Sequence, residues 1–166
     1  MVADVELIHK AIFEPVFGER TLAFRSLRKH GVNFPIVIGE KEAPHQKTRR
    51  GTSGKQVKQS LGKALATFER DVGALDSADQ PLLYDAAKAA VRLYSKVIGI
   101  HPFFDGNGRT AWAVFSYALQ RCSLVEIAIP PTEETRWALG QALRQDGSQS
   151  YEPLTTIVVD AIKRSV

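Results

Sequence analysis

Apolar residues recur at intervals of three and four along most of the chain, which is the spacing of amphipathic helices. The two longest such stretches lie in the middle of the sequence. The first carries one apolar stripe, formed by Val57, Leu61, Ala64, Leu65, Phe68, Val72 and Leu75. The second begins near Pro81 and has a broad apolar face, formed by Leu82, Leu83, Ala86, Ala87, Ala90, Val91, Tyr94, Val97 and Ile98. A broad face is buried on several sides, so we expect the second helix at the centre of the fold.

Shorter stretches with the same spacing predict four further helices. The first contains Leu7, Ile8, Ala11 and Ile12 and is expected to stop before Pro15, because proline has no backbone N–H. A core helix ends near Cys122 and carries Ala111, Val114, Phe115, Ala118 and Leu119. A helix from about Thr132 carries Trp137, Leu139, Ala142 and Leu143. The last helix starts at Pro153 and carries Leu154, Ile157, Val158, Ala161 and Ile162.

The helical pattern fails between Gly18 and Gly54, where only the run from Pro35 to Gly39 has the composition of a short strand bounded by breakers. The chain has 166 residues, 44% hydrophobic and 24% charged, which is ordinary for one globular domain and excludes a disordered or collagenous chain. No apolar run approaches the roughly 18 residues of a membrane-spanning helix. We therefore expect a single domain over residues 1–166, an all-α helical bundle with one partly extended insertion.

Charge is concentrated in that insertion. Between Arg20 and Lys58 there are ten basic and two acidic residues, whereas the rest of the chain has 12 basic and 16 acidic ones. Such a segment is either a solvated loop or a surface for an acidic protein, nucleic acid or phosphorylated ligand. A nucleic-acid-binding module is the least favoured of these readings, because stacking on bases needs several exposed rings and the segment offers little beyond Phe24 and Phe34.

The N-terminal residues and the single cysteine say little about the function of the protein. Met1 to Lys10 has the character of neither a signal nor a transit peptide, so the expected location is the cytoplasm, and secretion of an effector into a host cell stays open. Cys122 is the single cysteine, so no disulfide forms within the chain. It falls in an apolar helical stretch, which favours a small buried hydrophobe over a catalytic thiol.

A nine-residue segment between two predicted core helices, HPFFDGNGR, combines the groups needed for phosphate transfer. Gly106 and Gly108 let the backbone turn its amides toward one point at the start of the next helix, where anions bind. Arg109 adds a planar cation suited to phosphate, and Asp105 is a hard oxygen ligand for Mg²⁺. His101 is the nearby side chain that can accept a proton at neutral pH.

Other candidate sites are weaker. The run Gly51–Gln56 is similar to the end of a phosphate-binding Walker loop, but its first glycine is too close and Gln56 replaces the required hydroxyl residue. His9, His30 and His45 have no metal-ligand spacing, and we expect them at the surface.

The segment resembles the signature of the Fic family, H-P-F-x-[D/E]-G-N-G-R-x-x-R, and the flanking stretches 8–13, 136–139 and 151–154 are similar to helices of that family. The resemblance implies a helical fold with a β-hairpin flap, at approximately residues 20–54, over the active site. It also implies transfer of AMP from ATP to a Ser, Thr or Tyr hydroxyl of a target protein, which we expect to dock on the basic flap. The implied roles are base for His101, Mg²⁺ ligand for Asp105, and nucleotide-phosphate binding for Gly106, Asn107, Gly108 and Arg109.

Two departures from the family pattern bear on the reaction. Trp112 stands where the family has its second arginine, which contacts the terminal phosphate of ATP and pairs with an inhibitory glutamate. The inhibitory motif is absent too, since the Ser148 and Glu152 spacing is followed by Pro153. We therefore expect no glutamate clamp, and a separate antitoxin chain stays open. Family members without the second arginine include Doc-type toxins, which transfer the terminal phosphate, and enzymes that transfer UMP or phosphocholine, so these remain alternatives.

Overall fold

The computed structural model describes residues 2–17, 24, 37–38, 49–50, 52–79, 82–129, 132–144 and 151–166. Most of these belong to six α-helices: α1 (Val2–Phe17), α2 (Val57–Asp76), α3 (Leu83–Ile100), α4 (Asn107–Arg121), α5 (Glu133–Arg144) and α6 (Glu152–Ser165). A 3-10 turn, η3 (Gly54–Gln56), leads into α2. The predicted all-helical architecture is confirmed. In the described part of the chain, no helix is both long and apolar enough to cross a membrane.

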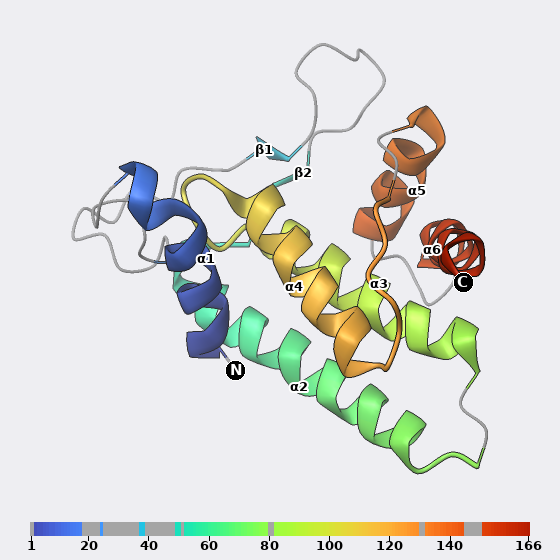
Figure 1. Ribbon diagram of the computed structural model, residues 1–166. Coiled ribbons are helices and arrows are strands. Elements are labelled where there is room, and N and C mark those ends of the chain that lie inside the picture. The colour runs from blue at the N-terminus through green and yellow to red at the C-terminus, as the bar shows by residue number, and fades with distance from the viewer. Residues whose placement is uncertain are drawn as a thin grey trace.

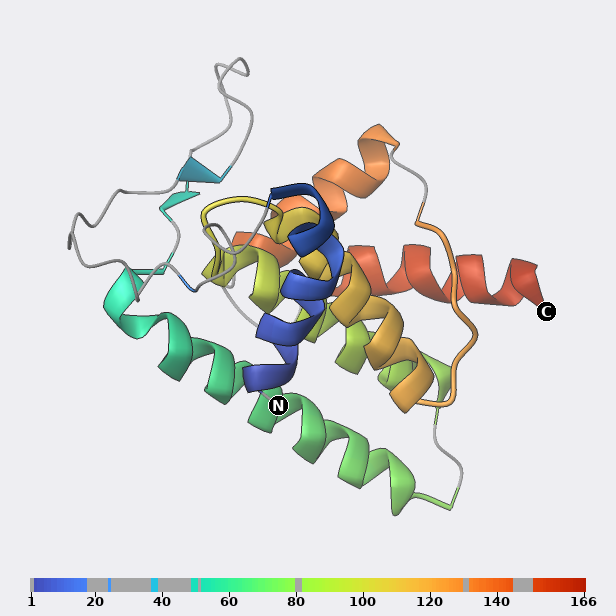
Figure 2. The same cartoon turned by 60° about the vertical axis from the view of Figure 1, so that its left-hand side comes forward.

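Helix α3 is the centre of the bundle, as its broad apolar face predicts. It packs against α2, α4, α5 and α6, and α1 lies across α2 and α4 (Figure 1). Helices α5 and α6 pack against each other on another side of α3 (Figure 2). The first half of α3 is rich in buried alanines, and small side chains allow neighbouring helices to approach closely. The predicted stripe of α2 is also buried, at Val57, Leu61, Leu65, Phe68 and Val72.

Helix α1 differs from the prediction at its end and on its buried face. It continues through Pro15 to Phe17, because a proline in the last turn removes only one backbone hydrogen bond close to the helix end. Its buried residues are Val5, His9 and Phe13, four apart, whereas Leu7 is 61% exposed. The prediction that His9 lies at the surface is therefore wrong, and this helix buries a polar side chain that a hydrophobicity count ignores.

Helix α5 also differs in its buried face. Trp137 is 58% exposed, whereas the predicted Ala142 is fully buried, the predicted Leu139 packs against the core, and Ala138 is buried in addition. The helix begins where the sequence predicts, because the Thr132 hydroxyl accepts a hydrogen bond from the Thr135 N–H over 3.2 Å. Helix α6 begins at Glu152, one residue before the predicted start at Pro153.

Two short strands, β1 (Val37–Ile38) and β2 (Arg49–Arg50), pair antiparallel with Val37 opposite Arg50 (Figure 1). Strand β1 lies within the predicted strand. The rest of the predicted flap lies mostly outside the described residues, so its position over the active site stays a prediction.

Candidate active site

The segment from His101 to Arg109 forms the connection between α3 and α4, and its first residue has an unusual backbone. His101 caps α3 in the left-handed conformation, with φ 54° and ψ 61°, and its N–H donates to the Val97 carbonyl over 3.0 Å. This conformation costs a residue with a side chain roughly 1–2 kcal/mol, and glycine is the usual choice at a helix end. Among the described residues, only His101 and Ser123 combine a side chain with a positive φ. A strained histidine points to a use for its side chain.

The connection is held closed by the buried side chain of Asn107. Its Oδ1 accepts a hydrogen bond from the Phe103 N–H over 2.8 Å, and its Nδ2 donates to the Phe103 carbonyl over 2.9 Å. The amide thus satisfies both backbone groups of one residue in a site where an unpaired polar group would be costly. Of the groups assigned to phosphate binding, Asn107 can therefore contribute its backbone N–H, while its side chain serves the loop.

Gly106 is required by both its backbone and its surroundings. It adopts φ 74°, in the left-handed region, and a Cβ at this position would overlap the ring of Phe13 from α1. Gly108 differs, because it lies inside α4 and a Cβ there would meet no atom within 4 Å. The two glycines therefore do different work: the first turns the chain against α1, and the second leaves open space at the start of α4.

The start of α4 has the properties of an anion site. The first backbone hydrogen bond of the helix runs from the Thr110 N–H to the Gly106 carbonyl over 3.0 Å, so the preceding amides of Asn107, Gly108 and Arg109 have no acceptor within the helix. Gly108 and Arg109 are exposed, and the first turn carries no acidic residue. Free amides and the helix dipole together favour a negatively charged ligand here.

Asp105 stands immediately before this turn with an exposed side chain, and its Oδ1 accepts a hydrogen bond from the Gly106 N–H over 2.6 Å. Among the residues that the structure describes, no three His, Cys, Asp or Glu side chains gather closely enough to hold a metal ion by themselves. Mg²⁺ commonly binds through one or two carboxylates together with substrate phosphates and water. One carboxylate beside an anion site fits that mode of binding.

Helix α1 contacts the loop through His9, a residue that the sequence analysis did not assign to the site. Its Nε2 donates to the Asp105 carbonyl over 3.0 Å, and its ring stacks on Phe103 with centroids 3.7 Å apart and an angle of 13°. Desolvation lowers the pKa of His9, although its hydrogen bond with Asp105 acts in the opposite direction. The lowered pKa favours the neutral ring, which makes this contact. The available signal was its place four residues after Val5 and four before Phe13, on one helix face.

Phe13 extends this support to the cationic end of the loop. Its ring faces Gly106, and the guanidinium of Arg109 lies over the same ring, 4.3 Å from the centroid. Phe24 adds a further ring, stacked on Phe103 with centroids 5.1 Å apart. The loop thus rests on a group of aromatic side chains, and Arg109 is positioned by packing as well as by charge.

Trp112 lies one turn after Arg109 and packs with aromatic residues of the core. Its ring is 6.3 Å from that of Tyr94 on α3, edge to face, and 5.6 Å from that of Phe115. The sequence left open whether Trp112 lines the site or packs into the core, and these contacts account for its large apolar area by packing.

Burial raises the pKa of Cys122 to about 11, which agrees with its prediction as an unreactive thiol.

The chain is similar to proteins named Protein adenylyltransferase Fic, from Drosophila sechellia at 27% identity over 106 residues and from Drosophila willistoni at 26% over 113 residues. These alignments cover 64% and 68% of this chain but 20% and 22% of the relatives, so the chain spans about one fifth of their length.

The fold is similar to the crystal structure of a Fic domain containing signaling protein from Bacteroides thetaiotaomicron. The TM-score is 0.72 at 15% identity, and the match covers 99% of this chain and 60% of that protein. The sequence pattern of the Fic/DOC family matches residues 2–119, which is more than half of the chain and includes the whole loop. The chain therefore belongs to the Fic/DOC family.

Proposed function

We propose that this protein transfers AMP from ATP to a Ser, Thr or Tyr hydroxyl of a target protein. The observation that carries the proposal is the loop itself: a strained His101, an exposed Asp105 and the open start of α4 lie within one short connection that α1 holds in place. The family and the names of the relatives support the same class of reaction.

Each loop group has a role in this reaction. The amides at the start of α4 and the guanidinium of Arg109 bind the phosphates of ATP, and His101 accepts the proton of the target hydroxyl. The hydroxyl oxygen then bonds to the α-phosphorus, and pyrophosphate leaves. Asp105 would hold Mg²⁺, which when bound neutralises phosphate charge. Because His101 and the amides are fixed at opposite ends of one short loop, base and phosphate need little reorganisation.

Phosphate transfer of the Doc type is the second candidate, and Trp112 is the residue that favours it. An indole packed on Tyr94 cannot contact the terminal phosphate of ATP by charge, so a reversed nucleotide can compete with the AMP-transferring one. Transfer of UMP or phosphocholine has the same motivation.

Incubation of the protein and a cell lysate with ATP labelled at either the α or the γ phosphate tests the proposal. Label from the α position on protein, with an added mass of AMP by mass spectrometry, is the expected result. If the target carried label from the γ position alone, the reaction would be phosphate transfer and the proposal of AMP transfer would be wrong. Absence of both labels, with a UMP or phosphocholine mass on the target, would assign one of those groups instead. The matched control is His101→Ala, which should add no label beyond that of the lysate alone.

A further inference from the structure

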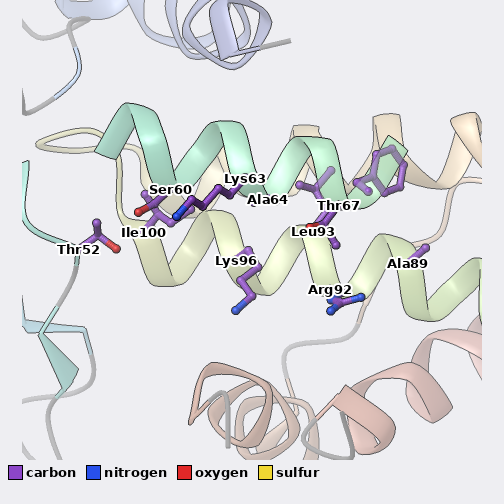
Figure 3. A pocket seen from close by; sticks show the side chains of 11 residues that line it. Thr52, Ser60, Lys63, Ala64, Thr67, Ala89, Arg92, Leu93, Lys96 and Ile100 are labelled. Atoms are coloured by element: carbon purple, nitrogen blue, oxygen red, sulfur yellow. The ribbon is translucent and has the colours of Figure 1, made fainter. Parts of the chain in front are cut away.

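A groove of about 350 Å³ runs along the seam between α2 and α3, but it does not reach the candidate site. Its lining includes Ala64 on α2 and both Leu93 and Ile100 on α3 (Figure 3). None of the described lining residues lies between His101 and Arg109. The contacts of the loop with α1 are therefore the ones that bear on the proposed chemistry.

The buried side chain of His9, on α1, has one ring nitrogen with a partner and one without. A carbonyl oxygen only accepts hydrogen bonds, so the Nε2 that contacts the Asp105 carbonyl carries the proton and Nδ1 is left as an acceptor. Among the described residues, no group donates to this buried Nδ1. An aliphatic side chain would fill the same space without an unpaired acceptor. The bond from Nε2 is therefore the contribution that calls for a histidine.

This bond acts on the peptide unit that holds the Asp105 carboxylate. The carbonyl that accepts from His9 belongs to the same peptide unit as the Gly106 N–H, and that N–H donates to Asp105 Oδ1 over 2.6 Å. Because a peptide unit is planar, a bond that fixes its oxygen also fixes the direction of its N–H. The two hydrogen bonds also polarise each other through the peptide unit. His9 is thus linked to the carboxylate through one rigid group.

We propose that His9 is a positioning residue for the metal ligand: its hydrogen bond fixes the Asp105–Gly106 peptide unit, which orients the Asp105 carboxylate for Mg²⁺. The inference rests on the proposed function, because it takes Asp105 to hold Mg²⁺ beside the phosphates of ATP. The stacking of His9 on Phe103 is a separate contribution, and it can be kept while the donor is removed.

Hydrogen exchange of the Gly106 amide, measured by NMR on the full chain without nucleotide or metal, tests the first step. His9→Phe keeps a ring beside Phe103 but has no donor, so Gly106 should exchange at least about tenfold faster, the effect of about 1.4 kcal/mol. His9→Leu has no donor either and should show the same acceleration. His9→Gln has an N–H donor without the ring and should restore slow exchange.

Two controls separate this effect from a general loosening of the protein. The Phe103 N–H is held by the Asn107 side chain, so it should exchange at the normal rate in His9→Phe. Leu7→Ala changes an exposed residue of the same helix and should leave Gly106 unchanged. Circular dichroism verifies that each variant is folded.

Calorimetry of ATP binding, with Mg²⁺ or with a chelator, tests the second step. Mg²⁺ should strengthen ATP binding to the unmodified protein, and His9→Phe should reduce this advantage at least about tenfold while binding in chelator stays the same. His9→Gln should retain most of the advantage. A role in folding alone would weaken binding equally in both solutions.

Unchanged Gly106 exchange in folded His9→Phe and His9→Leu would overturn the inference. Equal acceleration in His9→Gln would do so too, since the donor would then be irrelevant. If Mg²⁺ gave the unmodified protein no advantage, the metal role of Asp105 and the inference would both be wrong. The α-labelled ATP assay is read separately: the expected exchange and calorimetry without AMP transfer would contradict the proposed function and leave the role of His9 standing.

Discussion

At the scale of single residues, the loop contains one residue in a strained conformation, His101, and one whose side chain stabilises the loop, Asn107. His101 occupies a conformation that glycine would adopt more easily, whereas Asn107 satisfies both backbone groups of Phe103. In the proposed reaction the side chain of His101 accepts a proton, whereas the side chain of Asn107 holds the shape of the loop. These contributions can be separated, because substitutions at the two positions are expected to change the free energy of unfolding in opposite directions.

Replacement of His101 by glycine should stabilise the protein and abolish transfer. Glycine relieves the left-handed strain, so the free energy of unfolding should rise by about 1 kcal/mol, while the group proposed to accept the proton is lost. Denaturant unfolding and α-labelled ATP transfer measure the two effects. His101→Ala is the matched control, since it is equally inactive without the conformational gain. Transfer by either variant at the normal rate would remove His101 from the mechanism.

The change Asn107→Asp should destabilise the protein despite its nearly identical shape. Aspartate can accept the Phe103 N–H but cannot donate to the Phe103 carbonyl, and the loss of that buried bond should cost about 1–3 kcal/mol. The reduced free energy of unfolding should be accompanied by weaker ATP binding, measured by calorimetry. A variant with normal stability would show that the amide does not hold the loop.

At the scale of elements, the site is a contact between α1 and the beginning of α4. The two glycines at this contact form a matched pair, because Gly106 touches Phe13 in a left-handed conformation while Gly108 is helical with open space around it. The same substitution at two positions can therefore distinguish packing against α1 from room for a ligand.

Gly106→Ala should destabilise the protein by more than the roughly 1–2 kcal/mol of left-handed strain, since its Cβ also displaces Phe13. Gly108→Ala should instead raise the free energy of unfolding by up to about 1 kcal/mol, because alanine favours a helix, and should weaken ATP binding by crowding the amides. Thermal unfolding and calorimetry on both variants provide the comparison. Normal ATP affinity in Gly108→Ala would place the phosphates away from the first turn of α4.

At the scale of the whole molecule, basic charge is gathered near the insertion while the rest of the chain is acidic. If the target docks on this segment, Arg49→Glu/Arg50→Glu should raise the KM for target far more than the KM for ATP, and the effect should fade as salt increases. Steady-state kinetics at two ionic strengths measure this. Equal increases in the two KM values would assign the segment to nucleotide binding.

Much of this molecule follows from its sequence, because α2, α3 and α4 each bury a face that repeats with helical spacing. The spacing of His101, Asp105 and the glycines also identified the connection that forms the candidate site. The supporting contacts were not predictable in this way. His9 is polar, so no count of apolar positions selects it, and its partners Phe103 and Asp105 are far away in sequence. The side-chain role of Asn107 depends on a contact with one backbone unit, which no spacing reveals.

The hydrogen bond from His9 to Asp105 joins residues 96 positions apart, and this has a consequence for the order of events during folding. Helices α2, α3 and α4 follow one another and pack as sequence neighbours, so their contacts close short loops and can form early. The contact of α1 closes a much longer loop and carries the larger entropy cost. Helix α1 leaves the ribosome before α4, yet its contact with the loop can form only after α4 has been made. Catalytic competence is thus expected to appear late in folding, after most of the helical structure has formed.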